Sequence, residues 1–189
     1  MLDNFFIESI SKTLRSIDDI SVAHDFAQSF SHNQITCKTW LFEELKSVHT
    51  PSKICIIGSW YCTVLPYLLR DYTLHCCDID PRVHPYANQF MKNASIDGTS
   101  SLYDVKDLDL TRYNTIINTS CEHMPDMINY KISPLSVCAF QSNNYYIPEH
   151  TNCKQSLEEF IESTGITNIM YSGIIRMKKY DRYMVIGTR

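Results

Sequence analysis

The 189-residue sequence predicts an α/β fold around a mostly parallel sheet, and two stretches carry this prediction. Residues 53–81 read as a short apolar run (54–57), a glycine, a helix-length amphipathic segment and a second apolar run (74–77) that ends on an acid. This order is typical of a strand, a crossover helix and a second, parallel strand. The chain closes with two β-rich runs joined by the polar segment K-K-Y-D-R, which predicts an antiparallel hairpin.

The part before residue 53 has a helical pattern. Apolar residues recur at helical spacing at 5–17, 22–30 and 35–48, and Asp3 or Asn4 precedes the first segment as an N-cap. The length and the hydrophobic fraction of 44% suffice for one sizeable core. We therefore expect a helical flank, residues 1–52, on one compact unit, residues 53–189.

The remaining elements are predicted from turn and cap signals. Pro81 is expected to open a helix that runs to Met91, and the D-G pair at 97 and 98 is expected to form a turn. Ser156 is expected to open a helix to residue 163, because Glu159 completes a capping-box pattern. The other expected elements are strands at 102–105, 115–118 and 135–141, a helix through 126–128, and hairpin strands at 169–177 and 183–188.

Composition disfavours several classes of partner. The net charge of −4 creates no basic field for phosphates, so nucleic acid is not an expected partner. No apolar stretch approaches the roughly 18 residues that span a bilayer, so no membrane is expected. Eight cysteines without a secretory signal indicate free thiols in the cytoplasm. No C-x-x-C pair is present, and no metal is expected.

Residues 53–81 predict a nucleoside-containing ligand. Gly58 and Asp78 are 20 residues apart, close to the separation at which βαβ units place a carboxylate on ribose hydroxyls. Two structural alternatives stay open. Gly58 also suits a positive-φ turn after a buried strand, and Asp78 or Asp80 also suits the N-cap of a helix beginning near Pro81.

Residues 53–189 carry further motifs. I-C-I-I-G-S-W-Y, C-D-I-D-P-R-V and Y-D-V-K-D-L-D, with the hairpin last, resemble the glycine loop, the ribose-binding acid and the adenine-binding segment of class I S-adenosylmethionine-dependent methyltransferases. The resemblance implies a Rossmann-like, mostly parallel seven-stranded sheet and S-adenosyl-L-methionine as cofactor. The implied cofactor contacts are Gly58, Ser59, Trp60, Tyr61, Asp78, Ile79, Asp104, Val105, Asn118 and Thr119.

Candidate catalytic and substrate residues follow the later strands. N-T-S-C-E-H-M-P-D-M resembles the E-H-L-P-D segment of small-molecule methyltransferases, and together with Q-S-N-N-Y it is similar to short methyltransferase-like proteins of tailed phages, which implies a host cytoplasm. We therefore expect catalytic roles for His123 and Glu122, and for Asn118. Glu122 and His123 also suit a helix cap. The expected substrate contacts are Asn143, Asn144 and Tyr145, which also suit a plain loop.

The glycine loop departs from the family pattern. It has Gly58 alone, followed by Ser59, Trp60, Tyr61 and Cys62, where the family usually carries two or three glycines. The Trp60 and Tyr61 rings either face the sulfonium of the cofactor or pack the crossover helix onto the sheet.

The leading function is methyl transfer to an unidentified O or N acceptor, a small molecule or a protein. The alternatives are aminocarboxypropyl transfer, as in nicotianamine-synthase-like proteins, and a non-catalytic binding or scaffold protein; the missing G-x-G-x-x-G disfavours a dehydrogenase.

Overall fold

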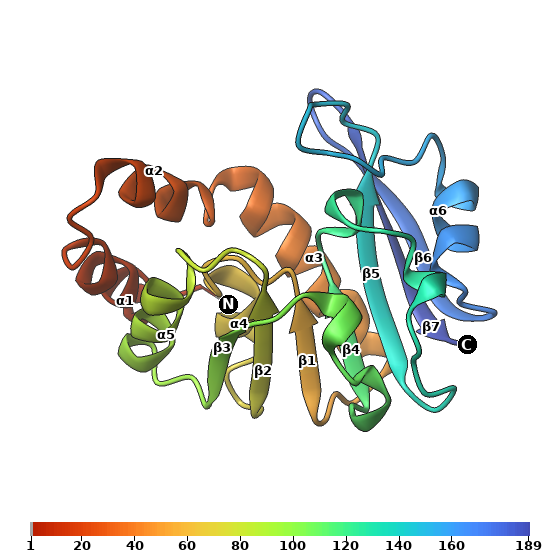
Figure 1. The fold of residues 1–189 in the computed structure, drawn as a ribbon, viewed down its shortest axis with the longest axis horizontal. Helices are drawn as coiled ribbons and strands as arrows, with labels where there is room; N and C mark the ends of the chain where they lie inside the picture. The colour runs from red at the N-terminus through yellow and green to blue at the C-terminus, as the bar shows by residue number, and fades with distance from the viewer. Residues whose placement is uncertain (1) are drawn as a thin grey trace.

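The computed structural model describes residues 2–189, whose seven strands form one sheet in the order β3-β2-β1-β4-β5-β7-β6 (Figure 1). Strand β7 (Asp181–Thr188) runs antiparallel to its neighbours β5 and β6 (Asn168–Arg176). The parallel strands are β1 (Ile54–Ile57), β2 (Leu74–Asp78), β3 (Gly98–Leu102), β4 (Thr115–Asn118) and β5 (Val137–Asn143). The predicted fold class, a mostly parallel sheet closed by a hairpin, is confirmed.

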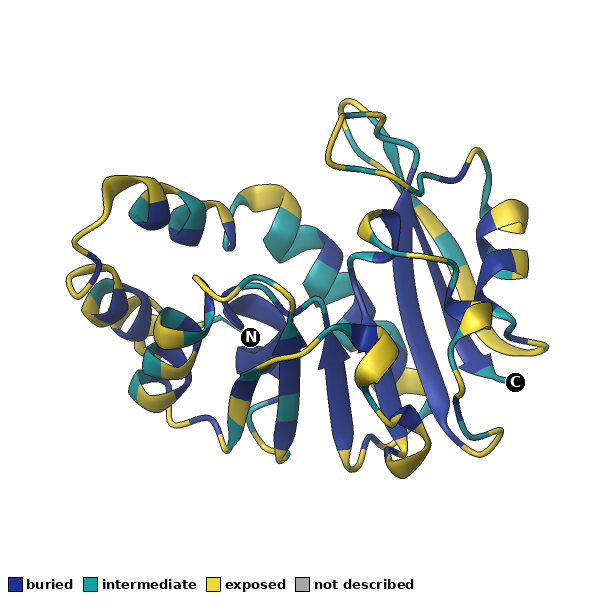
Figure 2. Cartoon of the chain, viewed as in Figure 1, coloured by how far each residue is buried: buried dark blue, intermediate teal, exposed yellow. Residues whose placement is uncertain are grey.

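Both faces of the sheet are covered because successive strand residues point to opposite sides. In β1, Ile54 and Ile56 pack against one set of helices, whereas Cys55 and Ile57 pack against the other side. The first set is α1 (Asn4–Leu14), α2 (Ile20–Gln28), α3 (His32–Val48), α4 (Val64–Leu68) and α5 (His84–Asn93). The other side holds α6 (Leu157–Thr164) and short 3-10 turns. Strands β1, β4 and β5 are buried along their whole length (Figure 2).

The helix caps follow the sequence. The Asp3 carboxylate accepts the backbone N–H of Phe6, as predicted for an N-cap. Ser156 accepts the N–H of Glu159, and Gly165 ends α6 in the left-handed conformation. Across residues 2–189, no helix is both long and apolar enough to cross a bilayer.

Four predictions are wrong. The third strand begins at Gly98 and ends at Leu102, before the predicted 102–105. Strands β2 and β3 approach so closely that a β-carbon on Gly98 would lie 2.5 Å from the Leu74 carbonyl oxygen, so this glycine belongs to the strand, not to a turn. Helix α5 begins at His84 instead of Pro81, because the Asp80 carboxylate accepts the N–H of Arg82 and forms a turn first.

The fourth wrong prediction is the helix expected through residues 126–128. The segment forms two 3-10 turns, Cys121–His123 and Met127–Asn129. Pro125 lies between them and lacks the N–H that a continuous helix needs. The side-chain amide of Asn152 also donates a hydrogen bond to the backbone carbonyl of Met124, at 2.8 Å.

Gly187 is required where the hairpin strands meet. An added β-carbon would overlap the carbonyl oxygen of Asn168 and lie 2.7 Å from Ile166 Cγ2. We expect Gly187→Ala to lower the free energy of unfolding by about 2–3 kcal/mol, because neither backbone can yield without opening the pairing. Urea unfolding followed by circular dichroism measures this. Ser172→Ala, at an exposed position on β6, is the control; an equal loss in both variants would refute the assignment.

Candidate functional site

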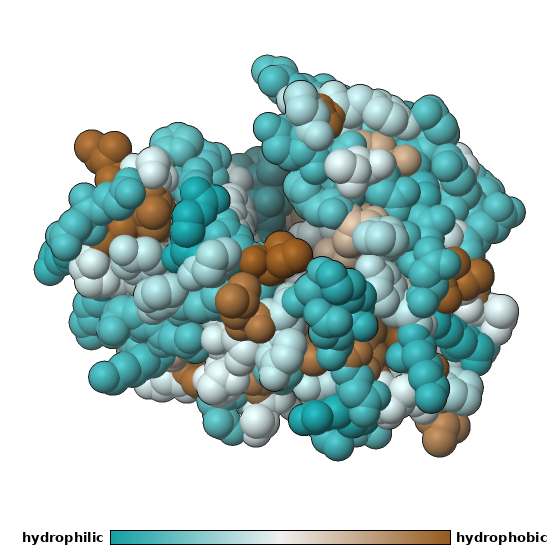
Figure 3. All heavy atoms as spheres, in the orientation of Figure 1, coloured by the Kyte–Doolittle hydropathy of each residue, from teal (hydrophilic) through white to brown (hydrophobic). Residues whose placement is uncertain are grey.

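A cavity of about 720 Å³ opens at the carboxyl ends of the parallel strands. It lies where the winding of the sheet reverses between β1 and β4, which is where open α/β sheets bind ligands. Figure 3 shows the surface hollowed between the helical part of the chain and the part around β5. Eleven residues expected at a site line the cavity: Gly58, Trp60, Asp78, Ile79, Asp104, Val105, Thr119, Glu122, His123, Asn143 and Tyr145.

The Asp78 carboxylate joins the glycine loop to the end of β2. Its Oδ2 accepts the N–H of Trp60 at 2.8 Å, and its Oδ1 accepts the N–H of Asp80 at 3.0 Å. Each carboxylate oxygen has about two acceptor sites, so each keeps one for a ligand. Asp78 therefore presents two fixed acceptor positions to the cavity.

The loop after β1 bends through positive φ angles. They are 59° at Gly58, 49° at Trp60 and 55° at Cys62, the last two on residues that disfavour this conformation. The loop is held in place because the N–H of Ser59 bonds the Cys77 carbonyl at 3.0 Å. This geometry places the Trp60 side chain on the cavity wall.

Four of the expected site residues do not line the cavity. Ser59 is buried against the Cys77 carbonyl. Tyr61 is buried, its ring packs on Phe26 at 5.5 Å, and burial raises its pKa to about 12. These placements differ from the expected cofactor contacts, because the positive φ at Trp60 turns the next side chain into the core.

The other two residues that do not line the cavity are asparagines whose side-chain amides stabilise loops. Asn118 is fully buried: its Nδ2 lies 3.0 Å from the Met124 sulfur and its Oδ1 accepts the N–H of Ser120. The side-chain amide oxygen Oδ1 of Asn144 accepts the N–H of Asp181 at 2.7 Å. Their polar groups hold the loops after β4 and β5, so neither expected ligand contact is found at the cavity surface.

Asp104 follows β3 at the cavity edge. Its carboxylate accepts the N–H of Lys106 at 3.1 Å and pairs with the Lys106 ammonium at 2.8 Å. These contacts lower the pKa of Asp104. Val105 is buried beside it and lines the same edge.

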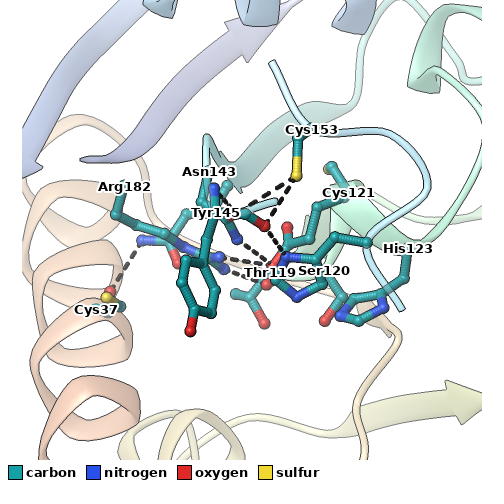
Figure 4. A network of polar contacts seen from close by, with 12 residues as sticks. Cys37, Thr119, Ser120, Cys121, His123, Asn143, Tyr145, Cys153 and Arg182 are labelled. Carbon is teal, nitrogen blue, oxygen red and sulfur yellow. Dashed lines mark hydrogen bonds and ion pairs between the residues drawn. The ribbon is translucent and has the colours of Figure 1, made fainter. Parts of the chain in front are cut away.

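A buried ion pair lies at the opposite end of the cavity. Glu122 Oε1 accepts from Arg182 Nη1 at 2.8 Å and from Asn143 Nδ2 at 2.7 Å, and Arg182 also donates to the Thr119 carbonyl. Figure 4 shows Arg182, Asn143 and Thr119 meeting from three elements of the chain. Burial disfavours the charge of Arg182, but the Glu122 carboxylate outweighs it and raises the pKa of Arg182.

Arg182 and Lys38 line the cavity, and the sequence interpretation missed both. Arg182 is the charged residue among the buried positions of β7, and a buried arginine requires an acidic partner. Lys38 has no acidic partner among residues 2–189. Burial and the nearby Arg182 charge lower the pKa of Lys38 to about 8.

Lys38 is expected to react fastest of the lysines with an acylating reagent. At pH 8 about half of its amine is neutral, a fraction about 100-fold above that of an ordinary lysine. Limited acetylation followed by peptide mass spectrometry should therefore mark Lys38, with a rate that rises with pH to a midpoint near 8. Lys46, exposed on the same helix, is the internal comparison. Faster labelling at Lys46 would contradict the lowered pKa.

No protein-family model and no curated protein sequence matches the chain. Solved structures are similar to it. N-methyltransferase NodS from Bradyrhizobium japonicum WM9, in complex with S-adenosyl-L-homocysteine, matches with a TM-score of 0.70 and 15% identity over 99% of both chains. Magnesium protoporphyrin IX methyltransferase ChlM from Synechocystis PCC 6803, with bound SAM, has a TM-score of 0.61 and 14% identity over 100% of this chain and 98% of that one.

A third similar structure is MtNAS in complex with MTA and tNA, with a TM-score of 0.61 and 9% identity over 98% of this chain and 70% of that one. At these identities the likeness concerns the fold. The chain has the Rossmann-like fold of class I S-adenosylmethionine-dependent methyltransferases, the family that its motifs resemble.

Proposed function

We propose that the protein binds S-adenosyl-L-methionine in this cavity and catalyses transfer of its methyl group to an acceptor. The observation that carries the proposal is the Asp78 carboxylate, which two backbone N–H groups fix at the end of β2 with one free acceptor site on each oxygen. Two adjacent ribose hydroxyls fit such a pair of acceptors. The similar structures solved with S-adenosyl-L-homocysteine and SAM support the same cofactor.

The residues on either side of Asp78 fit the two ends of the cofactor. Asp104 and Val105 line the cavity edge after β3. The backbone of this segment and the apolar side chain of Val105 suit contact with adenine. Gly58 and Thr119 line the cavity at β1 and β4, toward the methionine end. Bound there, the cofactor would supply an electrophilic methyl group on a sulfonium.

The acceptor would lie toward Glu122, His123 and Tyr145. The Nδ1 of His123 lies 3.1 Å from the Glu149 carbonyl, which only accepts, so in the neutral imidazole Nδ1 carries the proton. The Nε2 atom then keeps a lone pair that suits proton abstraction from an O or N acceptor. The described site favours a small or extended acceptor that enters the cavity.

Binding tests the first step. We expect isothermal titration to show that S-adenosyl-L-methionine and S-adenosyl-L-homocysteine each bind with a stoichiometry of one per chain. Both should bind at the same site, because both contain the same ribose. Absence of heat with either at millimolar concentration, from folded protein, would refute the proposal and favour a non-catalytic scaffold.

Aminocarboxypropyl transfer from the same cofactor is the second candidate. Two observations favour it: the similarity to MtNAS, and Trp60 on the wall where the family usually has small residues. Trp60 would turn another carbon of the cofactor toward the acceptor. Product analysis separates the two reactions, since methyl transfer releases S-adenosylhomocysteine and aminocarboxypropyl transfer releases methylthioadenosine.

A further inference from the structure

We propose that Glu122, His123 and His150 form a binding site for one divalent transition-metal ion at the acceptor end of the cavity. All three line the cavity. Each offers a ligand atom, and these atoms lie within 4.8 Å of one another. The sequence predicted no metal because His150 is distant along the chain and joins the adjacent E-H pair only in the fold.

The two imidazoles lie together and each contacts a backbone carbonyl through Nδ1. Their ring centroids are 4.6 Å apart. His123 Nδ1 lies 3.1 Å from the Glu149 carbonyl and His150 Nδ1 lies 2.6 Å from the Tyr145 carbonyl. A carbonyl only accepts, so in the neutral imidazoles Nδ1 carries the proton and Nε2 has the lone pair that a metal ion needs. Metal-binding histidines usually have this second hydrogen bond to a carbonyl or carboxylate.

Glu122 supplies an oxygen that has no partner. Its Oε1 is held by Arg182 and Asn143, whereas Oε2 is buried and accepts no hydrogen bond. The residue is only 4% exposed. An unpaired buried carboxylate oxygen is costly, and a cation beside it removes the cost. Arg182 and Asn143 fix the carboxylate, as outer partners of metal ligands do.

The backbone already joins the two segments that carry the ligands. The N–H of Asn152 donates to the Glu122 carbonyl at 2.9 Å, and Asn152 Nδ2 bonds Asp126 at 2.8 Å. The loop with His150 is thereby held against the turn with Glu122 and His123. The three ligand atoms are thereby kept within 4.8 Å of one another.

The ligand types indicate which ion binds. Two imidazole nitrogens and one carboxylate oxygen suit Zn²⁺ or Co²⁺, whereas Mg²⁺ and Ca²⁺ prefer oxygen alone. Among residues 2–189 no fourth His, Cys, Asp or Glu belongs to the cluster, so one position remains open toward the cavity. This step rests on the proposed function and replaces His123 as the base, because His123 Nε2 would then be a ligand of the ion. An acceptor hydroxyl bound at the open position would lose its proton more easily, since a metal ion lowers the pKa of a bound hydroxyl.

Equilibrium dialysis of the untagged protein against Zn²⁺, with metal analysis, tests the site. We expect one Zn²⁺ per chain, and at least about 100-fold weaker binding by His150→Ala. His24→Ala is the matched control, because His24 is exposed on α2 and does not line the cavity; it should bind Zn²⁺ as the wild type does. Binding by wild type below one equivalent, or equal affinities of the two folded variants, would overturn the site.

The metal site and the proposed function fail separately. Titration of metal-free wild type with S-adenosyl-L-homocysteine reports on the cofactor alone, and Zn²⁺ dialysis without cofactor reports on the metal alone. Circular dichroism of each variant establishes that it is folded. Zn²⁺ bound without cofactor binding would support the site and refute the methyltransferase; the reverse result would refute the site only.

Discussion

Asp78→Ala is expected to weaken binding of S-adenosyl-L-homocysteine at least about 100-fold. The carboxylate offers one free acceptor site on each oxygen, and hydrogen bonds to charged groups contribute about 1.5–3 kcal/mol each. Two such bonds give about 3 kcal/mol or more, which corresponds to about two orders of magnitude in the dissociation constant. Isothermal titration of wild type and variant measures the difference.

Two further variants separate ribose binding from loop damage. Asp71→Ala removes an exposed acid that does not line the cavity, so its dissociation constant should equal that of the wild type. Asp78→Asn keeps one oxygen acceptor without the charge, so its affinity should lie between those of wild type and Asp78→Ala. Wild-type affinity in folded Asp78→Ala would contradict the assigned role.

Arg182→Met is expected to lower the free energy of unfolding by about 3–5 kcal/mol. Both charged groups of the Glu122–Arg182 pair are largely withdrawn from water, with side chains 6% and 9% exposed. Removal of one partner leaves a buried charge without compensation, and this dominates the cost. The variant also loses the bond from Arg182 to the Thr119 carbonyl. Urea unfolding measures the change.

A double variant and a surface control complete this test. Glu122→Gln/Arg182→Met removes both charges, so it should recover a large part of the loss. Arg15→Met changes an exposed arginine at the end of α1 and should shift stability by less than about 0.5 kcal/mol. An Arg182→Met loss no larger than that of Arg15→Met would refute a structural role for the ion pair.

Strands with continuous apolar runs could be predicted from the sequence. β1 and β4 have the predicted bounds, because each is a four-residue run buried between two neighbours. β3 could not be located, since G-T-S-S-L carries no apolar run. It lies at the edge of the sheet, where a polar strand is tolerated. The strand was predicted at residues 102–105 instead, because that stretch is more apolar.

Some residues of the site could be predicted from local sequence patterns, whereas others come together only in the folded chain. Gly58 and Asp78 belong to one βαβ unit, so their spacing alone brought them to one cavity. Arg182, Lys38 and His150 come from β7, α3 and a loop, and no local pattern relates them to Glu122. Tyr61 and Asn118 lie at motif positions in the sequence, but their side chains are buried in the fold and do not line the cavity.

The most direct measurement is a crystal structure of the protein grown with saturating S-adenosyl-L-homocysteine. The account predicts density in the cavity of about 720 Å³, with both ribose hydroxyls within hydrogen-bond distance of the Asp78 carboxylate. Density at another surface, or an empty cavity under conditions in which calorimetry shows binding, would contradict it.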